Sequence, residues 1–177
     1  MAFAILRAEK LKTMGNIGGS LAHNYRTIDT PNANPSQTPN NFHSLKDSEA
    51  VKAAISERLP EKRRSDAVLC VEYMITASPE WQGWNDERQN EYFKQAVDWL
   101  EQRHGKHNVV ATSIHRDETT PHLIAYVVPL DQDTGKLNAK KFLGGKAKLA
   151  EMQSSFSDHV KNLGLKRGIE GSKAKHT

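Results

Sequence analysis

The residues that decide the fold are NVVATSIHR (108–116) and HLIAYVVPL (122–130), two apolar runs joined by the five-residue connection DETTP (117–121). Both runs are rich in β-branched residues, which is typical of β-strands. A connection this short turns the chain back on itself, so the two strands are expected to pair as an antiparallel hairpin. The sheet that contains them is therefore at least partly antiparallel.

Further strands and helices are predicted on both sides of this hairpin. Residues 2–8 and 68–76 have the composition of strands, and the Pro- and Asn-rich stretch 30–41 is a long loop. Helices are predicted from apolar periodicity and from their ends, over residues 13–28, 46–59, 86–104 and 146–163. The order β-α-α-β-α-β-β-α predicts a single α/β (α+β) domain over residues 1–177. Its central antiparallel sheet should have about five strands, with helices packed mainly on one side.

Composition excludes several classes of protein. The chain is 37% hydrophobic and 26% charged, as in ordinary globular domains, and no apolar run reaches the roughly 18 residues that span a bilayer. No membrane contact is therefore expected from this segment. The single cysteine, Cys70, cannot form an internal disulfide and fits a reducing cytoplasm. Its place in an apolar strand favours an inert core thiol over a nucleophile.

Positive charge is concentrated near the C-terminal end of the sequence. Residues 136–177 hold 10 of the 25 lysines and arginines but only 3 of the 21 acidic residues. Such a basic segment is either a solvated surface or a phosphate-binding one, and charge alone does not separate the two.

Two histidines and two carboxylates lie within the eight residues HRDETTPH (115–122). His115 ends one strand of the hairpin and His122 begins the next, so their side chains can converge at one end of the sheet. Asp117 and Glu118 lie in the loop between them. Imidazole and carboxylate together suit Mn²⁺, Mg²⁺, Zn²⁺ or another divalent ion. The alternative is a surface loop whose polar residues only form turns.

The first predicted helix offers a second candidate. At about 100° per residue, His23 and Arg26 fall on its polar face. Tyr25 falls in the apolar stripe, which makes it a poor candidate for an exposed nucleophile. The alternative for His23 and Arg26 is an ordinary solvent-exposed face. The stripe itself consists of Met14, Ile17, Leu21, Tyr25 and Ile28.

Four segments together resemble one family, the mobilization relaxases of the Mob/Pre type (the MobV group), which belong to the HUH nucleases. LAHNYR (21–26) is similar to the family motif HNxR, and NANPSQTPNN (32–41) to its Asn-rich motif. HRDETTPHLIAYVVP (115–129) resembles HxDExTPHxHxxxVP, and LGLKRGIEGSKAKHT (163–177) resembles LGLxRGxxGSxAxH. The matches occur in order along nearly the whole chain.

The resemblance implies a relaxase domain of HUH type that acts in the bacterial cytoplasm. Such a domain nicks one strand of plasmid origin-of-transfer DNA by metal-assisted transesterification. It forms a covalent 5′-phosphate adduct during conjugative mobilization or plasmid recombination. Carried over by motif, His23 is the nucleophile, Arg26 supports the developing charge, and Glu118 completes the catalytic set.

The resemblance also implies a metal site for Mn²⁺ or Mg²⁺ on adjacent central strands. Its ligands carry over as His115, His122 and Glu118, with Asp117 beside them. The family motif has a histidine two residues after His122, whereas this chain has Ile124, which cannot coordinate a metal. Alternate residues of a strand face the same way, so Ile124 stands where a third ligand belongs. Either Glu118 or Asp117 completes the site with water, or the metal binds weakly, or catalysis is impaired.

Plasmid origin DNA, single-stranded or folded as a hairpin, is the implied partner, and relatives continue into a further region through which a homodimer could form. Trp81, Trp84 and Tyr126 are candidates to stack on unpaired bases, although packing roles are favoured. The residues expected to hold the DNA backbone are Lys136, Lys140, Lys141, Lys146, Lys148, Lys166 and Arg167.

Other activities remain open at this point. An HUH replication initiator performs the same nicking step, although the HNxR motif and the GSKAKH ending (171–176) favour mobilization. A DNA-binding module with impaired catalysis is favoured by Ile124. A metal-dependent hydrolase of another substrate is a third alternative, for which no second feature of the sequence argues.

Overall fold

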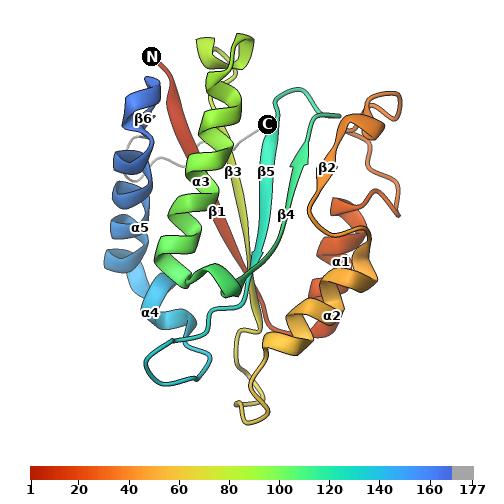
Figure 1. Ribbon diagram of the computed structural model, residues 1–177, viewed down its shortest axis with the longest axis vertical. Helices are drawn as coiled ribbons and strands as arrows, with labels where there is room; N and C mark the ends of the chain where they lie inside the picture. Colours follow the sequence, from red (N-terminus) through yellow and green to blue (C-terminus); the bar gives the residue numbers. More distant parts are fainter. Residues whose placement is uncertain (169–177) are drawn as a thin grey trace.

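The computed structural model describes residues 1–168, which form a six-stranded sheet with helices on both of its faces (Figure 1). The strand order is β2-β4-β5-β3-β1-β6, and every neighbouring pair is antiparallel except β1 with β6. The strands are β1 (Phe3–Leu11), β2 (Phe42–His43), β3 (Cys70–Ala77), β4 (Val109–His115), β5 (His122–Val127) and β6 (Lys166–Arg167). The helices are α1 (Met14–Asn24), α2 (Ser48–Arg58), α3 (Arg88–His104), α4 (Ala139–Leu143) and α5 (Gly145–His159).

The predicted fold class is confirmed, and the four long strands are the four predicted ones. Strands β5 and β3 form the middle of the sheet, and β4, the other strand of the hairpin, pairs with the opposite side of β5. The two strands that sequence reasoning missed, β2 and β6, are two residues long and lie at the two edges. Strands this short carry no alternating pattern for a sequence to display.

The helices cover both faces of the sheet, so the expectation that they pack mainly on one side is wrong. Helices α3, α4 and α5 pack on one face, over Tyr73, Ile75 and Leu123. Helices α1 and α2 cover the other face, over Ile124 and Tyr126. Figure 1 shows these two groups of helices on opposite sides of the molecule. The sequence did indicate helices on both faces, because residues 123–127 of β5 are an unbroken apolar run, as expected of a strand buried on both faces.

Two predicted helices have different ends in the structure. The first was expected to reach Ile28, but α1 ends at Asn24, and Arg26 adopts a positive φ of 57° that stops the helix. The last was expected over 146–163, but α5 begins at Gly145 and ends at His159. Gly145 has a φ of 81°, which separates α5 from the short helix α4 before it.

The described residues contain no helix long and apolar enough to cross a membrane. Cys70 is fully buried at the start of β3, and burial raises the pKa of its thiol to about 12. The burial of Cys70 and the raised pKa of its thiol agree with the expectation of an inert core thiol.

The register of the strands places the residues of interest at two opposite ends of the sheet. His115 pairs with His122 where the β4–β5 hairpin turns, and we call this the histidine end. At the other end of the same strands, Val71 pairs with both Val127 and Lys10. We call this second end the basic end.

Candidate metal centre

The hairpin fixes the positions of the two central histidines. His115 is the last residue of β4 and His122 the first of β5, and the two are direct partners in the register. Both are buried, with their rings perpendicular and their centroids 4.8 Å apart. Glu118 reaches back from the connecting loop, with its Oε2 3.2 Å from Nε2 of His122 and 3.9 Å from Nδ1 of His115. His115, Glu118 and His122 form the one group among residues 1–168 whose donor atoms are placed to hold a metal.

The backbone fixes which nitrogen of each ring carries its proton. Nε2 of His115 lies 2.9 Å from the carbonyl oxygen of Asn24, and Nδ1 of His122 lies 3.4 Å from that of Thr120. A carbonyl only accepts, so these outer nitrogens carry the protons. The inner nitrogens, Nδ1 of His115 and Nε2 of His122, therefore both present lone pairs, although they are 2.9 Å apart. Two lone pairs and a carboxylate oxygen that converge in this way fit a bound cation.

Burial keeps both histidines neutral, as metal ligands must be. Burial, with smaller contributions from His122 and Arg26, lowers the pKa of His115 to about 3. Burial also lowers the pKa of His122, although the nearby Glu118 carboxylate opposes the shift.

Arg26 joins the end of α1 to the hairpin loop. Its Nε and Nη2 donate to the two carboxylate oxygens of Asp117 at 2.9 and 2.8 Å, and Nη2 also donates to Glu118 at 3.0 Å. Its Nη1 donates to the carbonyl oxygen of His23 at 3.0 Å. The guanidinium thus fixes the loop carboxylates and the end of the helix in one geometry. The αL conformation that stops the helix is the conformation in which Arg26 makes these contacts.

Asp117 occupies a different place from the one expected of a ligand. Its side chain is 0% exposed, and its oxygens accept from Arg26 and from the hydroxyl of Thr38 at 2.9 Å. Burial raises the pKa of Asp117, but these hydrogen bonds outweigh burial and hold the pKa well below its ordinary value. Asp117 also lies outside the group that can hold a metal. The geometry therefore disagrees with its assignment as a ligand and makes it the partner of Arg26.

His23 is exposed one residue before the end of α1, on the face that looks toward Glu72 of β3. Ser20, one helical turn earlier, donates a hydrogen bond to the Glu72 carboxylate. The Tyr126 hydroxyl lies 2.8 Å from the Ser20 hydroxyl. Burial raises the pKa of Glu72, while the hydrogen bond from Ser20 and the charge of His23 oppose that shift. Glu72 is therefore a half-buried carboxylate that is held by Ser20 of the helix that carries the candidate nucleophile.

A third histidine stands beside the pair. His43 of β2 stacks on Tyr25 with centroids 4.2 Å apart, and its ring lies 6.1 Å from that of His115. Its Nδ1 is 2.7 Å from the Ser113 hydroxyl, which also accepts from Asn24 at 3.1 Å. Tyr25 itself donates to the carbonyl of Leu45, so it occupies a packed position, as the apolar stripe indicated.

Sequence reasoning missed Glu72 and His43, for identifiable reasons. Glu72 is a single polar residue in an apolar strand, and its role depends on which helix covers it. His43 lies after the Asn-rich loop, in a strand too short to predict. The Asn-rich loop contacts the hairpin loop, because the backbone N–H of Asn34 donates to the Asp117 carbonyl and the Asn41 side-chain oxygen accepts from the Arg116 N–H.

Ile124 points to the same face as His122, as strand alternation predicts, and packs in the core beneath α1. No ligand atom is available at that position. Tyr126 and Trp81 are buried, and the Trp81 indole donates to the carbonyl of Leu163 at 3.0 Å. The Trp84 indole likewise donates to the Ser78 carbonyl. All three aromatic residues are thus held by packing, which was the favoured alternative to base stacking.

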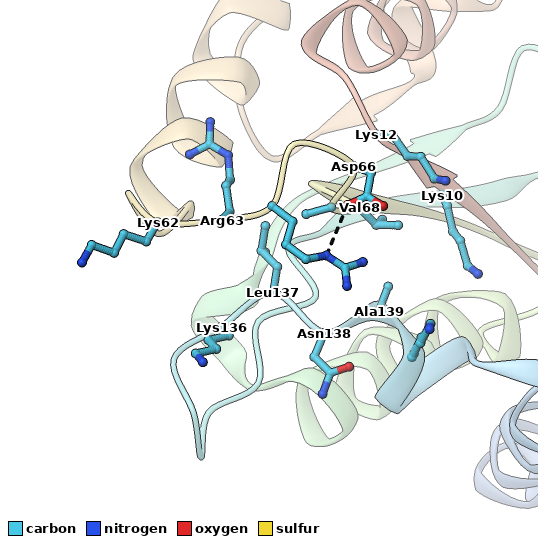
Figure 2. Close-up of a pocket in the computed structure, with 13 residues that line it drawn as sticks. Lys10, Lys12, Lys62, Arg63, Asp66, Val68, Lys136, Leu137, Asn138 and Ala139 are labelled. Carbon is cyan, nitrogen blue, oxygen red and sulfur yellow. Dashed lines mark ion pairs between the residues drawn. The ribbon is translucent and has the colours of Figure 1, made fainter.

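The basic residues expected to bind DNA lie on several elements, and their role stays a prediction. Lys136 and Lys140 line a cavity at the basic end (Figure 2), whereas Lys141 is paired with Asp131 at 3.0 Å. Lys146 and Lys148 are on α5, and Lys166 and Arg167 form the edge strand β6. The part of the LGLKRGIEGSKAKHT segment (163–177) beyond residue 168 lies outside the described residues.

A histidine pair on the adjacent strands β4 and β5, placed to hold a metal, lies at the same end of the sheet as the end of α1 that carries an exposed histidine. This is the arrangement expected of a relaxase-type domain. The structure agrees with that of the manganese-bound MobM relaxase domain (MOBV; Mob_Pre) in complex with plasmid pMV158 oriT DNA. The TM-score is 0.82 at 31% identity, over 99% of this chain and 95% of that one. A second manganese-bound structure of the same domain gives a TM-score of 0.81.

The chain belongs to the Mob_Pre family of plasmid recombination enzymes, which matches residues 1–177. It is 36% identical over 98% of its length to the 65 kDa protein of Zymomonas mobilis. It is 32% identical over 99% of its length to a plasmid recombination enzyme of Streptococcus agalactiae. The chain spans only 31% and 38% of the lengths of these two relatives.

Proposed function

We propose that this domain nicks one strand of plasmid origin-of-transfer DNA in the bacterial cytoplasm and remains attached to the 5′-phosphate. The observation that supports this proposal most strongly is that the inner nitrogens of His115 and His122 and the Glu118 carboxylate converge. The exposed His23 lies at the end of the neighbouring helix. Family membership supports the proposal, as does the likeness to a relaxase domain bound to oriT DNA.

His23 is the proposed nucleophile. A neutral ring nitrogen attacks the scissile phosphorus in line and the bond from phosphorus to the 3′-oxygen breaks. The leaving 3′-oxygen takes a proton from water and becomes a hydroxyl. The other ring nitrogen must give up its proton for the phosphoramidate to be neutral at nitrogen. Glu72 is held by Ser20, one helical turn before His23, so we assign its negative charge the role of attracting that proton.

His115, His122 and Glu118 would hold Mn²⁺ or Mg²⁺. When bound, the ion neutralises the scissile phosphate and favours the build-up of charge in the transition state. The carbonyls of Asn24 and Thr120 hold the two rings in the ligating tautomer. Burial of the histidines excludes water that would compete for the same nitrogens. With Ile124 in place of a third histidine, Glu118 is the ligand that completes the protein's set.

Arg26 acts here by positioning rather than by contact with the phosphate. Within residues 1–168, the hydrogen bonds of its guanidinium go to Asp117, Glu118 and the His23 carbonyl, and its side chain is only 11% exposed. It therefore ties the metal ligand Glu118 to the helix end that carries the nucleophile. This role differs from the charge-supporting one that the family resemblance implies.

Incubation of the domain with a supercoiled plasmid that carries an origin of transfer tests the proposal. We expect relaxed plasmid with protein on the 5′ end in the presence of Mn²⁺, and none with EDTA. The variant His23→Ala should bind the plasmid without relaxing it, while His107→Ala, which removes another exposed histidine, should relax it normally. Relaxation by His23→Ala would contradict the assignment.

A DNA-binding module without catalysis is the second candidate, and the observation that favours it is Ile124. The same assay separates the two, because a module binds origin DNA without forming an adduct at any Mn²⁺ concentration. Weak metal binding gives a third pattern, in which relaxation appears only at millimolar Mn²⁺.

A further inference from the structure

His43 of β2 is a histidine at the histidine end of the sheet that the proposed nicking chemistry does not use. It pairs with Ser113 of β4, and Ser113 pairs in turn with Ile124 of β5, so the three lie on one row across the sheet. Directly paired residues of antiparallel strands point to the same face. The next row on that face holds His115 and His122. The row in which Ile124 stands in place of the motif histidine therefore carries another histidine, on β2.

The ring of His43 is fixed by two contacts. Its Nδ1 lies 2.7 Å from the Ser113 hydroxyl, which also accepts from the side-chain amide of Asn24 at 3.1 Å. An amide N–H only donates, so the hydroxyl keeps its own hydrogen for Nδ1 of His43. The ring also stacks on Tyr25, with centroids 4.2 Å apart. His43 lies outside the group whose donor atoms can hold a metal, so in this arrangement it is an anchor and not a ligand.

Asn24, the last residue of α1, is held to β4 at two points. Its side chain is buried, and the Ser113 hydroxyl is the partner of its amide nitrogen, while its Oδ1 has no hydrogen-bond partner within residues 1–168. Its backbone carbonyl is one of the last four of the helix, which have no partner inside the helix. That carbonyl lies 2.9 Å from Nε2 of His115. The contact of the side chain with Ser113 therefore fixes where the carbonyl points.

The carbonyl of Asn24 affects His115 as a ligand. The C-terminal end of a helix carries a partial negative charge. A negative group at the outer N–H of a ligating histidine orients the ring and makes the opposite nitrogen a better donor to a metal. For His115 the opposite nitrogen is Nδ1, which faces His122 and Glu118. Because Ile124 supplies no third nitrogen, metal binding depends on the orientation of each of the two remaining rings.

We propose that His43 is a positioning residue of the metal site. Through the Ser113 hydroxyl it fixes the side chain of Asn24, which keeps the α1 carbonyl on Nε2 of His115 and aims Nδ1 of that ring at the metal. The proposal rests on the metal site of the proposed function but not on the nicking of DNA. Sequence reasoning could not have found this role, because β2, β4 and the end of α1 meet only in the fold.

Two substitutions separate the hydrogen bond of His43 from its stacking. His43→Phe keeps an aromatic ring against Tyr25 but removes the acceptor for Ser113. His43→Asn removes the ring but keeps an acceptor, because the Oδ1 of asparagine takes the position of Nδ1. His107→Phe is the control, since His107 is exposed and lies outside the candidate metal group.

The first measurement is Mn²⁺ affinity of the DNA-free domain by isothermal titration. We expect His43→Phe to lower the affinity about tenfold, and His43→Asn and His107→Phe to leave it within about twofold of the wild type. Equal losses in His43→Phe and His43→Asn would overturn the proposal, because stacking or direct ligation by His43 would then be responsible. Wild-type affinity in His43→Phe would overturn it as well.

The second measurement follows the hydrogen bond itself in the metal-free domain. An imidazole N–H held by a buried carbonyl exchanges slowly with water, so the Nε2 proton of His115 should give a signal in a ¹⁵N-resolved NMR spectrum. The signal should be lost in His43→Phe and kept in His43→Asn. A signal that survives in His43→Phe would contradict the coupling. Should His43→Phe fail to fold, Ser113→Ala, which removes the shared hydroxyl, replaces it in both measurements.

Failure of the nicking proposal gives a different pattern. If the wild-type domain does not nick but the variants change Mn²⁺ affinity and the NMR signal as expected, the nicking proposal fails and the role of His43 stands. If the domain nicks while His43→Phe leaves both quantities unchanged, the role of His43 fails and the nicking proposal stands.

Discussion

The two ends of the sheet treat charge in opposite ways. At the histidine end, Arg26, Asp117 and Glu118 are paired with one another, and the two carboxylates are 0% and 25% exposed. At the basic end, lysines surround an open cavity without partners among residues 1–168. His122 and Val127, at the two ends of β5, are five residues apart, which is about 17 Å of extended strand. This is beyond the roughly 10 Å over which salt screens charges. Paired, buried charges fix a geometry for chemistry at the histidine end. The lysines at the basic end have no carboxylate partner among residues 1–168 and fix no such geometry.

The largest effect is expected from loss of a metal ligand. His115→Ala removes one of the two converging nitrogens, so nicking should fall at least about 1000-fold, and Mn²⁺ affinity at least about 100-fold. Isothermal titration with Mn²⁺ and a gel assay of plasmid relaxation measure the two quantities. A variant that nicks normally would show that the metal lies elsewhere.

Arg26→Ala should remove the ion pairs with Asp117 and Glu118 at the histidine end. It leaves the buried Asp117 carboxylate without its cation, which should cost about 3 kcal/mol of unfolding free energy. Urea unfolding measures the loss. Arg26→Lys should recover only part of it, because an ammonium cannot reproduce the two-pronged contact to Asp117. Equal stability of Arg26→Ala and the wild type would mean that the pair does not form in solution.

His104 isolates the effect of burial on a histidine that belongs to neither the metal group nor the lining of the cavity. It is fully buried against Tyr73, and burial, with a smaller contribution from Arg103, lowers its pKa to about 3. Between that value and an unfolded pKa near 6.5, the unfolded chain binds a proton that the folded one does not. Stability should therefore fall as the pH drops below 6.5.

The expected loss from His104 between pH 7 and pH 5 is about 2 kcal/mol. Urea unfolding at the two pH values measures it, and His104→Gln should reduce the pH dependence by that amount. Substitution of a cavity-lining residue at the basic end, such as Lys62→Gln, should not change the pH dependence of stability. An unaltered pH dependence in His104→Gln would place the titrating group elsewhere.

The smallest effect concerns Glu72. Glu72→Gln keeps the hydrogen bond from Ser20 but removes the charge near His23, so kcat for nicking should fall about tenfold with little change in KM. Mn²⁺ affinity should stay the same, because Glu72 is not among the candidate ligands. Glu9→Gln is the matched control, since Glu9 pairs with Glu72 in the register of the sheet. A drop in Mn²⁺ affinity would show that Glu72 acts on the metal instead.

Local patterns were sufficient to predict most of the fold. The apolar runs gave the four long strands, and the short DETTP connection gave the antiparallel hairpin. Where local patterns failed to predict the structure, the failure has a physical cause. Helical periodicity carried the first helix to Ile28, because nothing in the pattern shows that Arg26 turns out of the helix to reach Asp117.

The candidate site was predictable where its residues are close in sequence. His115, Glu118 and His122 lie on one hairpin, so their spacing alone brings them together. Glu72 and His43 come from strands that only the fold places beside α1 and β4. Asp117 could not be separated from Glu118 by sequence, because the difference between partner and ligand is decided by where Arg26 lies.

The central claim is that His23, at the histidine end of the sheet, forms the covalent bond to DNA. The most direct measurement is mass spectrometry of proteolytic fragments after reaction with origin DNA and digestion of the DNA to a short 5′-linked remnant. The account predicts a remnant on the fragment with His23, labile to acid as expected of a phosphoramidate. A remnant on Tyr25, or an acid-stable one on any other residue, would contradict it.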